Sequence, residues 1–427
     1  MKKIISAILA VAMLFSVCTL AGCNGSKDGE SSKKAGVSAD ILPRKEITST
    51  VKVPDDFKIG MICLHDENST YDNNFIQALK SVQKAFGLSD DQVLIVPNVG
   101  EDASCYDTAV DLAKKGCKII FADSFGHESF MKQAAQKYPD VQFCHATGTS
   151  SNVAGIKNFH NAFASIYEGR YLAGIAAGMK LNEMIESGKI TAKEAIIGYV
   201  GAFTYAEVIS GMTSFFLGAR SVCESATMKV RYTGSWYDQA KEQEAATALI
   251  KNDKCVLISQ HADSLGAPTA CELEGVPNVS YNGSTYSAGE NTFIVSSAIN
   301  WAPYFQYIIE SVVSGKEIDT DWCGDIAANS VVLTGINQDV AAKDTEKKIN
   351  EAIKEFEAGT LHVFDTSKWT LEGKKLDEYK ADVDGDFKPD TNVIHDGYFD
   401  ESNAKDFRSA PYFDIIIDGI TNLNKEV

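Results

Sequence analysis

The stretch Phe57-Lys-Ile-Gly-Met-Ile-Cys-Leu64 is an almost unbroken apolar run, and its length and composition predict a buried β-strand. Residues 74–86 follow it, and there Phe75, Leu79 and Val82 recur at the spacing that places side chains on one face of a helix. A buried strand followed by an amphipathic helix is the repeating unit of a parallel α/β fold.

The same alternation continues to about residue 145 and then begins again. Further strands of the first series are predicted at 93–97, 118–122 and 141–145, with helices at 106–115 and 129–137. The second series has helices at 167–184, 208–223, 239–251 and up to Leu273, and strands at 195–200, 228–232, 255–259 and 279–281. Two such series in tandem predict an α/β fold with parallel sheets and right-handed crossovers, arranged as two Rossmann-like lobes.

The rest of the chain is expected to return to these lobes. Its predicted elements are a strand at 292–296, a helix at 304–313, a strand at 330–334 and a helix at 343–358. We assign residues 56–160 and 283–298 to the N-terminal lobe, and residues 161–282 and 299–427 to the C-terminal lobe. Beyond about residue 361 the pattern is irregular and aromatic, which indicates an extension packed on the second lobe.

The N-terminus predicts export. Lys2 and Lys3 precede the apolar run from Ile4 to Leu20, and small residues lead up to Cys23. A basic start, an apolar core and a small-residue cleavage site are typical of a signal peptide, here residues 1–22. The ending Leu20-Ala-Gly-Cys23 resembles the bacterial lipobox, which implies a lipid on Cys23 and a membrane-anchored, exported protein. A plain transmembrane anchor is the alternative, and the apolar run is at the short limit for one.

Composition narrows the class further. Residues 23–55 are polar, rich in Ser, Gly and Lys at their start, and are expected to form a flexible tether. The formal charge is −18, and loss of the two lysines in residues 1–22 brings the mature chain to −20. Such a surface repels nucleic acid, so no nucleic-acid partner is expected. Eight cysteines remain after Cys23 without a CxxC pair, and Cys63, Cys144 and Cys255 are expected to be buried thiols.

Catalytic and metal signatures are absent from the sequence. It contains no GxGxxG, Walker, GxSxG or HExxH motif, and its seven histidines show no metal-ligand spacing. Asp382-Val-Asp-Gly-Asp386 begins like a calcium loop, but Phe387 and Val393 stand where an EF-hand requires Gly and Glu. We therefore expect a protein that is not an enzyme and that has no cofactor or metal. An exported enzyme using Asp123, His261 or Asp263 and an adhesive surface protein are the other classes considered.

Ligands of open parallel sheets bind beyond the carboxyl ends of the strands, so the loops there carry the candidate site. These loops are rich in aromatic and polar side chains: residues 65–73, 123–125, 201–205, 235–238, 260–264, 282–284 and 300–301. Aromatic faces can sandwich a planar ring while Asp and Asn read its polar edge. The predicted ligand-binding residues are Tyr71, Asp72, Asn73, Asp123, Phe203, Trp236, His261, Asp263, Asn282 and Trp301.

Three stretches resemble the basic membrane protein family of lipoproteins, whose best-known members are purine nucleoside receptors of importers. They are Tyr167-Glu-Gly-Arg-Tyr-Leu-Ala-Gly174, Ile197-Gly-Tyr-Val-Gly201 and Gly234-Ser-Trp-Tyr-Asp-Gln-Ala-Lys-Glu-Gln-Glu-Ala-Ala246. Order and spacing agree from about Ile59 to Gly315, and more loosely to Phe364. The resemblance implies a type I periplasmic-binding-protein fold that closes around its ligand by a hinge motion.

The resemblance also implies a ligand and partners. The expected ligand is a purine nucleoside or nucleobase, with Tyr71 and Phe203 matching the family's aromatic sandwich and Asp72 and Asn73 lying near its first-loop Asn. The expected partners are the permease subunits of an ABC importer, and a monomer is expected. A receptor for another small solute, such as a sugar, vitamin or signalling molecule, is the alternative on the same fold.

The sequence departs from the nucleoside receptors at two positions. Those receptors hold ribose with an Asp and a Lys, where this chain has Asn282 and the pair Asn300-Trp301. The stretches 260–264 and 300–304 look more like a branch thought to take purine bases. Trp301 is predicted to cover the space that a sugar would fill.

Overall fold

The computed structural model describes residues 34–382, 388–399, 401–403, 407–408 and 412–424. The chain divides into two units between Lys34 and Ala35, and all of the described helices and strands lie in the second unit. The predicted signal peptide, the lipid site Cys23 and most of the Asp382–Asp386 stretch fall outside the described residues.

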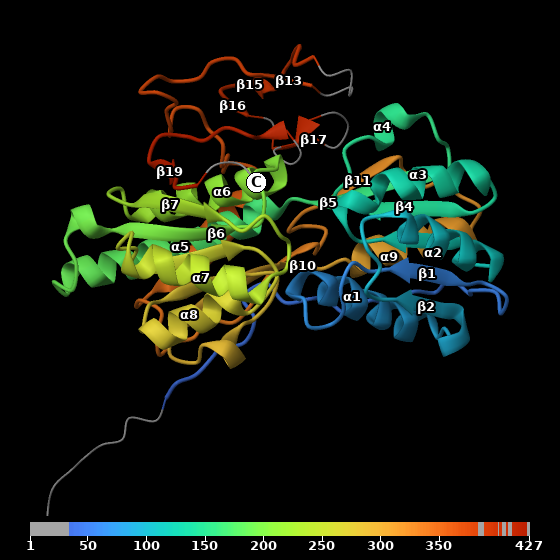
Figure 1. Cartoon of the computed structure of the whole chain (residues 1–427), viewed down its shortest axis with the longest axis horizontal. Coiled ribbons are helices and arrows are strands. Elements are labelled where there is room, and N and C mark those ends of the chain that lie inside the picture. The colour runs from blue at the N-terminus through green and yellow to red at the C-terminus, as the bar shows by residue number, and fades with distance from the viewer. Residues whose placement is uncertain (1–33, 383–387, 400, 404–406, 409–411, 425–427) are drawn as a thin grey trace, which may run out of the picture. The chain divides into compact units, whose positions relative to one another are not determined.

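A six-stranded parallel sheet forms the core of the first lobe (Figure 1). Its spatial order is β11 (Asp321–Gly324), β5 (Phe159–Ala164), β4 (Gln142–Ala146), β3 (Ile119–Ala122), β1 (Ile59–Ile62) and β2 (Val93–Val96). The strand predicted at Phe57–Leu64 is β1, and it pairs in parallel with both β2 and β3. Every residue of β1 and β3 is buried, as expected for central strands covered on both faces.

A seven-stranded sheet forms the core of the second lobe. Its order is β12 (Val331–Leu333), β10 (Phe293–Ile299), β9 (Asn278–Tyr281), β8 (Leu257–His261), β6 (Ile196–Gly201), β7 (Thr227–Tyr232) and β19 (Ile420–Asn422). All neighbours are parallel except β10 and β12. The predicted α/β class is thereby confirmed.

Helices connect the strands in the order that the apolar periodicity predicts. They are α1 (Thr70–Phe86), α2 (Ala103–Lys114), α3 (Glu128–Lys137), α4 (Ser151–Ala154), α5 (Ile166–Glu186), α6 (Ala206–Val222), α7 (Gln239–Lys251), α8 (Gly266–Glu274), α9 (Ala302–Val313) and α10 (Thr345–Glu357). Among these, α1 begins with Ser69 as its N-cap and ends at Gly87 in the left-handed conformation.

The lobe boundaries differ from the sequence-based assignment. Strand β10 was placed in the N-terminal lobe but pairs in parallel with β9 in the second sheet, as strands that are consecutive in the sequence usually do. Helix α9 was placed in the C-terminal lobe but packs on the first, where Phe305 contacts Phe121 at 5.0 Å between ring centroids. Strand β11 also belongs to the first sheet. The chain therefore crosses between the lobes after β5, β10 and β11.

The prediction of a flexible tether at residues 23–55 is wrong for residues 35–49. Leu42 exchanges backbone hydrogen bonds with Leu333 of β12 at 3.1 Å, and Ser38 donates to Ile336 at 2.9 Å. Ser49 donates to Glu310 of α9 at 2.7 Å. The segment 35–49 therefore lies across parts of both lobes, because its backbone groups pair with an edge strand that the composition argument did not consider.

Helices α5 and α6 pack very closely in the second lobe. A Cβ added at Gly174 would overlap the carbonyl oxygen of Phe215, and one at Gly218 would overlap that of Tyr171. Glycine at these positions lets the two helix backbones approach each other. Arg170 of α5 is fully buried beside this contact and donates to Ser280 O at 3.0 Å and to Ser259 Oγ at 2.8 Å.

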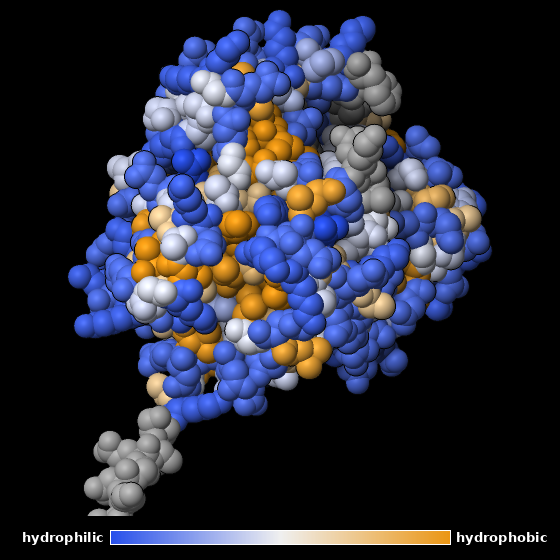
Figure 2. All heavy atoms as spheres, turned by 60° about the vertical axis from the view of Figure 1, so that its left-hand side comes forward, coloured by the Kyte–Doolittle hydropathy of each residue, from blue (hydrophilic) through white to orange (hydrophobic). Residues whose placement is uncertain are grey.

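The C-terminal extension adds β13 (Lys380–Ala381), β14 (Thr391–Asn392), β15 (Ile394–His395), β16 (Tyr398–Phe399), β17 (Ser402–Asn403) and β18 (Phe407–Arg408) before β19. It packs on the second lobe, where the rings of Phe364 and Tyr167 lie 5.9 Å apart and β19 pairs with β7 (Figure 1). Figure 2 shows the face that lies on the left of Figure 1, and its surface is largely hydrophilic, with apolar atoms between the polar ones. Within the described residues, no helix combines the length and the apolar character needed to cross a membrane.

Candidate functional site

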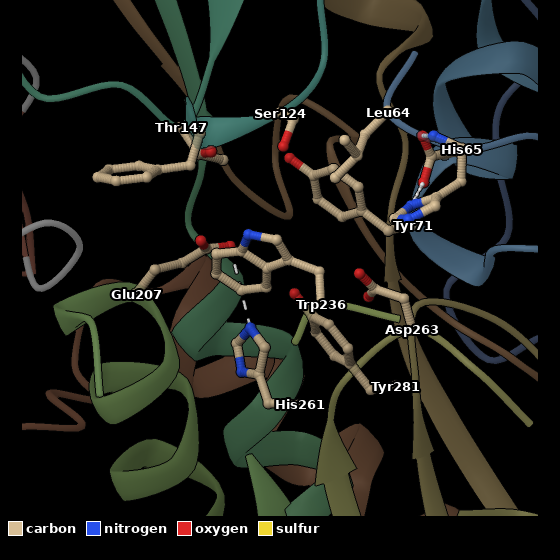
Figure 3. A pocket seen from close by; sticks show the side chains of 12 residues that line it. Leu64, His65, Tyr71, Ser124, Thr147, Glu207, Trp236, His261, Asp263 and Tyr281 are labelled. Atoms are coloured by element: carbon tan, nitrogen blue, oxygen red, sulfur yellow. Dashed lines mark hydrogen bonds and ion pairs between the residues drawn. The ribbon is translucent and has the colours of Figure 1, made fainter. Parts of the chain in front are cut away.

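A pocket lies between the two lobes at the carboxyl ends of their strands (Figure 3). Its enclosed space is about 20 Å³, because side chains from both lobes meet there. The first lobe supplies Leu64, His65, Tyr71, Asp72, Ser124, Phe125 and Thr147, and the second supplies Glu207, Trp236, His261, Asp263 and Tyr281. Its place beyond the strand ends agrees with the rule for open parallel sheets.

Asp72 is held rigidly on the first-lobe side. Its two oxygens accept hydrogen bonds from the His65 backbone N–H at 2.7 Å and from Ser69 Oγ at 2.6 Å. Burial alone would raise the pKa of Asp72, but the hydrogen bonds from His65 and Ser69 outweigh it and lower that pKa. Asp72 therefore belongs to the cap that starts α1 and presents a negative charge to the pocket.

Tyr71 and Asp123 are joined beneath that cap. The Tyr71 hydroxyl donates to the Asp123 carbonyl at 2.8 Å, which fixes the ring against the pocket. The Asp123 carboxyl is fully buried and accepts from the Leu64 backbone N–H at 3.0 Å. Desolvation, followed by the nearby charge of Asp72, raises the pKa of Asp123 well above its usual range.

His261 and Tyr281 form the floor on the second-lobe side. Their rings lie 4.1 Å apart, and each residue is only 2% exposed. Within the described residues, neither ring nitrogen of His261 nor the Tyr281 hydroxyl makes a hydrogen bond. Burial lowers the pKa of His261, although Glu207 opposes the shift with an oxygen 3.9 Å from Nε2. Buried polar atoms without partners are costly, so these are suited to a ligand.

Asp263 completes the polar set. Its backbone carbonyl accepts two hydrogen bonds from Thr70 across the lobes, from N and from Oγ1, each at 3.1 Å. Burial, with smaller contributions from Asp72, Glu242 and Glu207, raises the pKa of Asp263 well above its usual range. The amide of Asn282 opposes that shift. The Asp263 carboxyl points towards the centre of the pocket (Figure 3).

Aromatic rings close the rim from both lobes. Phe125 of the first lobe stacks on Tyr205 of the second at 5.1 Å, and His65 lies 5.3 Å from Tyr237. Trp236 projects between Glu207 and Tyr71 in the middle of the pocket (Figure 3). The rim of the pocket is therefore closed by ring contacts between the lobes.

The structure brings five of the predicted residues together in the pocket lining: Tyr71, Asp72, Trp236, His261 and Asp263. Asp123 lies directly beneath Tyr71, and Phe203 stands behind Trp236 with its ring 5.0 Å away. These positions follow from the strand ends on which the prediction was based.

Three predicted residues lie outside the lining. Asn73 accepts from Gln77 at 3.1 Å on the outer side of α1. The Asn282 backbone carbonyl accepts from Asn74 at 2.8 Å, which joins the lobes. Trp301 is 1% exposed and stacks on Phe75 at 4.4 Å within the core, so it does not cover the pocket.

Sequence reasoning missed Glu207 and Tyr281 as pocket residues. Glu207 lies in the first turn of α6 rather than in a loop, and Tyr281 is the last residue of β9. A signal for Glu207 exists in the sequence, because it is the single charged residue in the otherwise apolar and small stretch 206–219.

Cys63, Asp72 and Asp123 place one potential ligand atom each within 4.8 Å of the others, all buried. The chemistry of these three side chains does not favour a metal ion. Ser69 and His65 already occupy the oxygens of Asp72, and desolvation raises the pKa of the Cys63 thiol well above its usual range. A protonated thiol is a poor metal ligand.

Comparisons with known proteins agree with this arrangement. The family described as ABC transporter substrate-binding protein, PnrA-like, matches residues 61–360. A purine-binding protein of Brucella abortus (strain 2308) is 30% identical over 75% of this chain and 89% of its own length. An ABC transporter nucleoside-binding protein of Lactococcus lactis subsp. cremoris is 27% identical over 58% of this chain and 62% of its own length. A putative ABC transporter glucose-binding protein of Haloferax volcanii is 36% identical over 48% of this chain and 49% of its own length.

Solved structures support the fold. An ABC transporter solute-binding protein from Conexibacter woesei superposes with a TM-score of 0.57 at 21% identity, over 72% of this chain and 98% of that one. A solute-binding protein from Aeropyrum pernix gives a TM-score of 0.59 at 13% identity, over 72% and 92%. The type I periplasmic-binding-protein fold and the family resemblance predicted from sequence are both confirmed. This chain therefore belongs to the PnrA-like family of ABC transporter substrate-binding proteins and is an extracytoplasmic binding protein rather than an enzyme.

Proposed function

We propose that this substrate-binding protein takes a purine nucleobase or nucleoside into the pocket between its lobes and delivers it to an ABC permease. The observation that carries the proposal is that four aromatic side chains line the pocket: Tyr71, Trp236, His261 and Tyr281. Within the described residues, the His261 nitrogens and the Tyr281 hydroxyl make no hydrogen bond, and the nearest group to His261 Nε2 is Glu207 at 3.9 Å. Flat rings suit a flat heterocycle, and unpartnered polar atoms suit its ring nitrogens and exocyclic groups.

Between base and nucleoside, the contacts favour the base. The Asn300 amide donates to the backbone carbonyl and the side chain of Asn329 at 3.0 and 3.1 Å, so these donors are not free for a sugar. Trp301 lies in the core. Asn300 and Trp301, which stand at one of the two positions that hold ribose in the nucleoside receptors, are thus engaged in internal contacts.

A second candidate is a sugar, because one relative is described as a putative glucose-binding protein. Sugars also stack on Trp and Tyr faces. The four aromatic side chains of the lining, Tyr71, Trp236, His261 and Tyr281, favour a flat heterocycle over the puckered ring of a sugar.

The thermal-melt shift of residues 24–427 tests the ligand class against purine bases, purine nucleosides, pyrimidine nucleosides and glucose. We expect stabilisation by adenine, guanine or hypoxanthine, of about 2.7 kcal/mol at a hundredfold excess over Kd. Trp236→Ala should abolish most of the shift, whereas Tyr106→Ala, on the outer surface beside Lys137, should retain it. A shift with glucose alone would replace the purine proposal with the sugar.

We also propose that the protein is held at the membrane by a lipid on Cys23. The lipobox-like stretch Leu20-Ala-Gly-Cys23 at the end of the predicted signal peptide supports this proposal. Cys23→Ala should leave a precursor that is longer by the signal peptide and takes up no labelled fatty acid. A fully processed, lipid-labelled product from this variant would contradict the proposal.

A further inference from the structure

The pocket is rich in carboxyl groups. Asp72, Glu207 and Asp263 all line it, and Asp123 lies just beneath. Among the described residues, no Lys or Arg belongs to the lining. Of these carboxyls, hydrogen bonds from His65 and Ser69 lower the pKa of Asp72 and favour its anion, whereas burial raises the pKa of Asp263 and favours its neutral form.

The nearest buried cation is not available to a ligand. Arg170 lies behind Tyr281, with its guanidinium carbon 5.4 Å from the centre of that ring. Its nitrogens donate to Ser280 O, Tyr199 Oη and Ser259 Oγ at 3.0, 3.1 and 2.8 Å. Arg170 therefore supports the floor of the pocket without contributing a donor to it.

Glu207 is the carboxyl least engaged by the protein. Its side chain is 12% exposed, and the nearest partner in the described part of the chain is His261 Nε2 at 3.9 Å, beyond hydrogen-bond distance. Its position in the first turn of α6 places it at the positive end of the helix, which favours a negative charge there. The His261 ring and the Tyr281 hydroxyl, which make no hydrogen bond within the described residues, line the same pocket.

We propose that this pocket accepts uncharged purines rich in N–H donors and rejects purine anions such as urate, and that Glu207 is the residue that sets this selectivity. The inference rests on the proposed function. An N–H donor satisfies a carboxylate, whereas an anion placed beside Asp72 and Glu207 meets like charge in a space shielded from water.

Calorimetric titration at neutral pH tests the inference with hypoxanthine as the neutral ligand and urate as the anion. In the wild type, urate should bind at least about tenfold more weakly than hypoxanthine. Glu207→Gln should narrow this ratio several-fold, because the amide keeps the shape and removes the charge. Glu244→Gln, on the exposed face of α7, makes the same change in net charge outside the pocket and should leave the ratio unchanged. Equal binding of both ligands, or the same ratio in Glu207→Gln and wild type, would overturn the inference.

A ligand-free measurement separates this inference from the proposed function. The fluorescence of Trp236, taken as the difference between wild type and Trp236→Phe, should be quenched by caesium more than by iodide, relative to a free tryptophan amide. If no purine binds, the proposed function fails while the quenching still decides the charge of the pocket. Preferential quenching by iodide would overturn the charge inference even if hypoxanthine binds.

Discussion

Glu168 of α5 shows what burial does to a single carboxyl group. It is 8% exposed and accepts a hydrogen bond from the Ile326 backbone N–H at 2.8 Å. Burial raises its pKa from 4.5 to about 8, and that hydrogen bond only partly opposes the shift. The folded protein therefore keeps a proton that the unfolded chain releases above about pH 4.5, so this group stabilises the fold at low pH and loses that contribution as pH rises to about 8.

Glu168→Gln should remove this pH dependence. Between pH 5 and pH 9 the wild type should lose on the order of 3 kcal/mol in free energy of unfolding through this group. The variant should not show this loss, because glutamine carries no charge to desolvate. Denaturant unfolding at both pH values measures the change. Glu186→Gln, at the exposed end of the same helix, should show no such trend. Parallel pH profiles for Glu168→Gln and wild type would contradict the assignment.

Single residues also mark how far sequence could locate the site. Tyr71, Trp236 and Asp263 were predictable because each follows a strand that the apolar pattern reveals. Glu207 was not, because it falls between the loop 201–205 and the helix predicted from residue 208, so neither element included it. Trp301 follows a strand too, but stacks on Phe75 in the core, and only the tertiary packing decides between core and pocket for such a residue.

At the scale of elements, the α5–α6 pair depends on glycine. Gly174→Ala should lower the free energy of unfolding by about 1–3 kcal/mol, because the added methyl group overlaps the Phe215 carbonyl and the helices must separate. Urea denaturation measures the loss. Glu186→Ala, on the exposed part of α5, should change stability little. An unchanged midpoint for Gly174→Ala would show that the two helices can move apart without cost.

Strand prediction succeeded where strands are apolar and failed where they are polar. Strand β5 contains His160 and Asn161, whose side chains bond to Gln142 at 2.8 Å and to Asp321 at 2.9 Å. These partners satisfy the polar groups inside the lobe, but they come from distant parts of the sequence. Neither β5 nor β11 could therefore be recognised from a local pattern.

At the scale of the whole molecule, the two lobes contact each other directly. Thr70 donates to the Asp263 carbonyl, and Asn74 of α1 donates to the Asn282 carbonyl while accepting a hydrogen bond from Arg44. Two tandem lobes were predictable from the repeated strand–helix series. The returning strands were not, because β10 and β11 exchange lobes through pairings that depend on neighbours in space.

Asn74→Ala should favour the open form. Loss of the interlobe hydrogen bond, worth about 0.5–1.5 kcal/mol, should weaken ligand binding roughly threefold to tenfold. Small-angle scattering should show a larger radius of gyration for the ligand-free variant than for wild type. Gln77→Ala, on the exposed face of the same helix, should alter neither quantity. Unchanged affinity and radius would mean that this bond does not contribute to closure.

The direct bonds between Thr70 and Asp263 and between Asn74 and Asn282 also affect the transport cycle. Each bond lowers the binding free energy that a solute must provide to close the lobes. The same bond raises the ratio of closed to open receptor when no solute is bound. A permease that recognises the closed shape then meets empty receptors as well as loaded ones. When solute is scarce, we expect surplus empty receptor to compete with the loaded form for such a permease, and ATP to be hydrolysed without import.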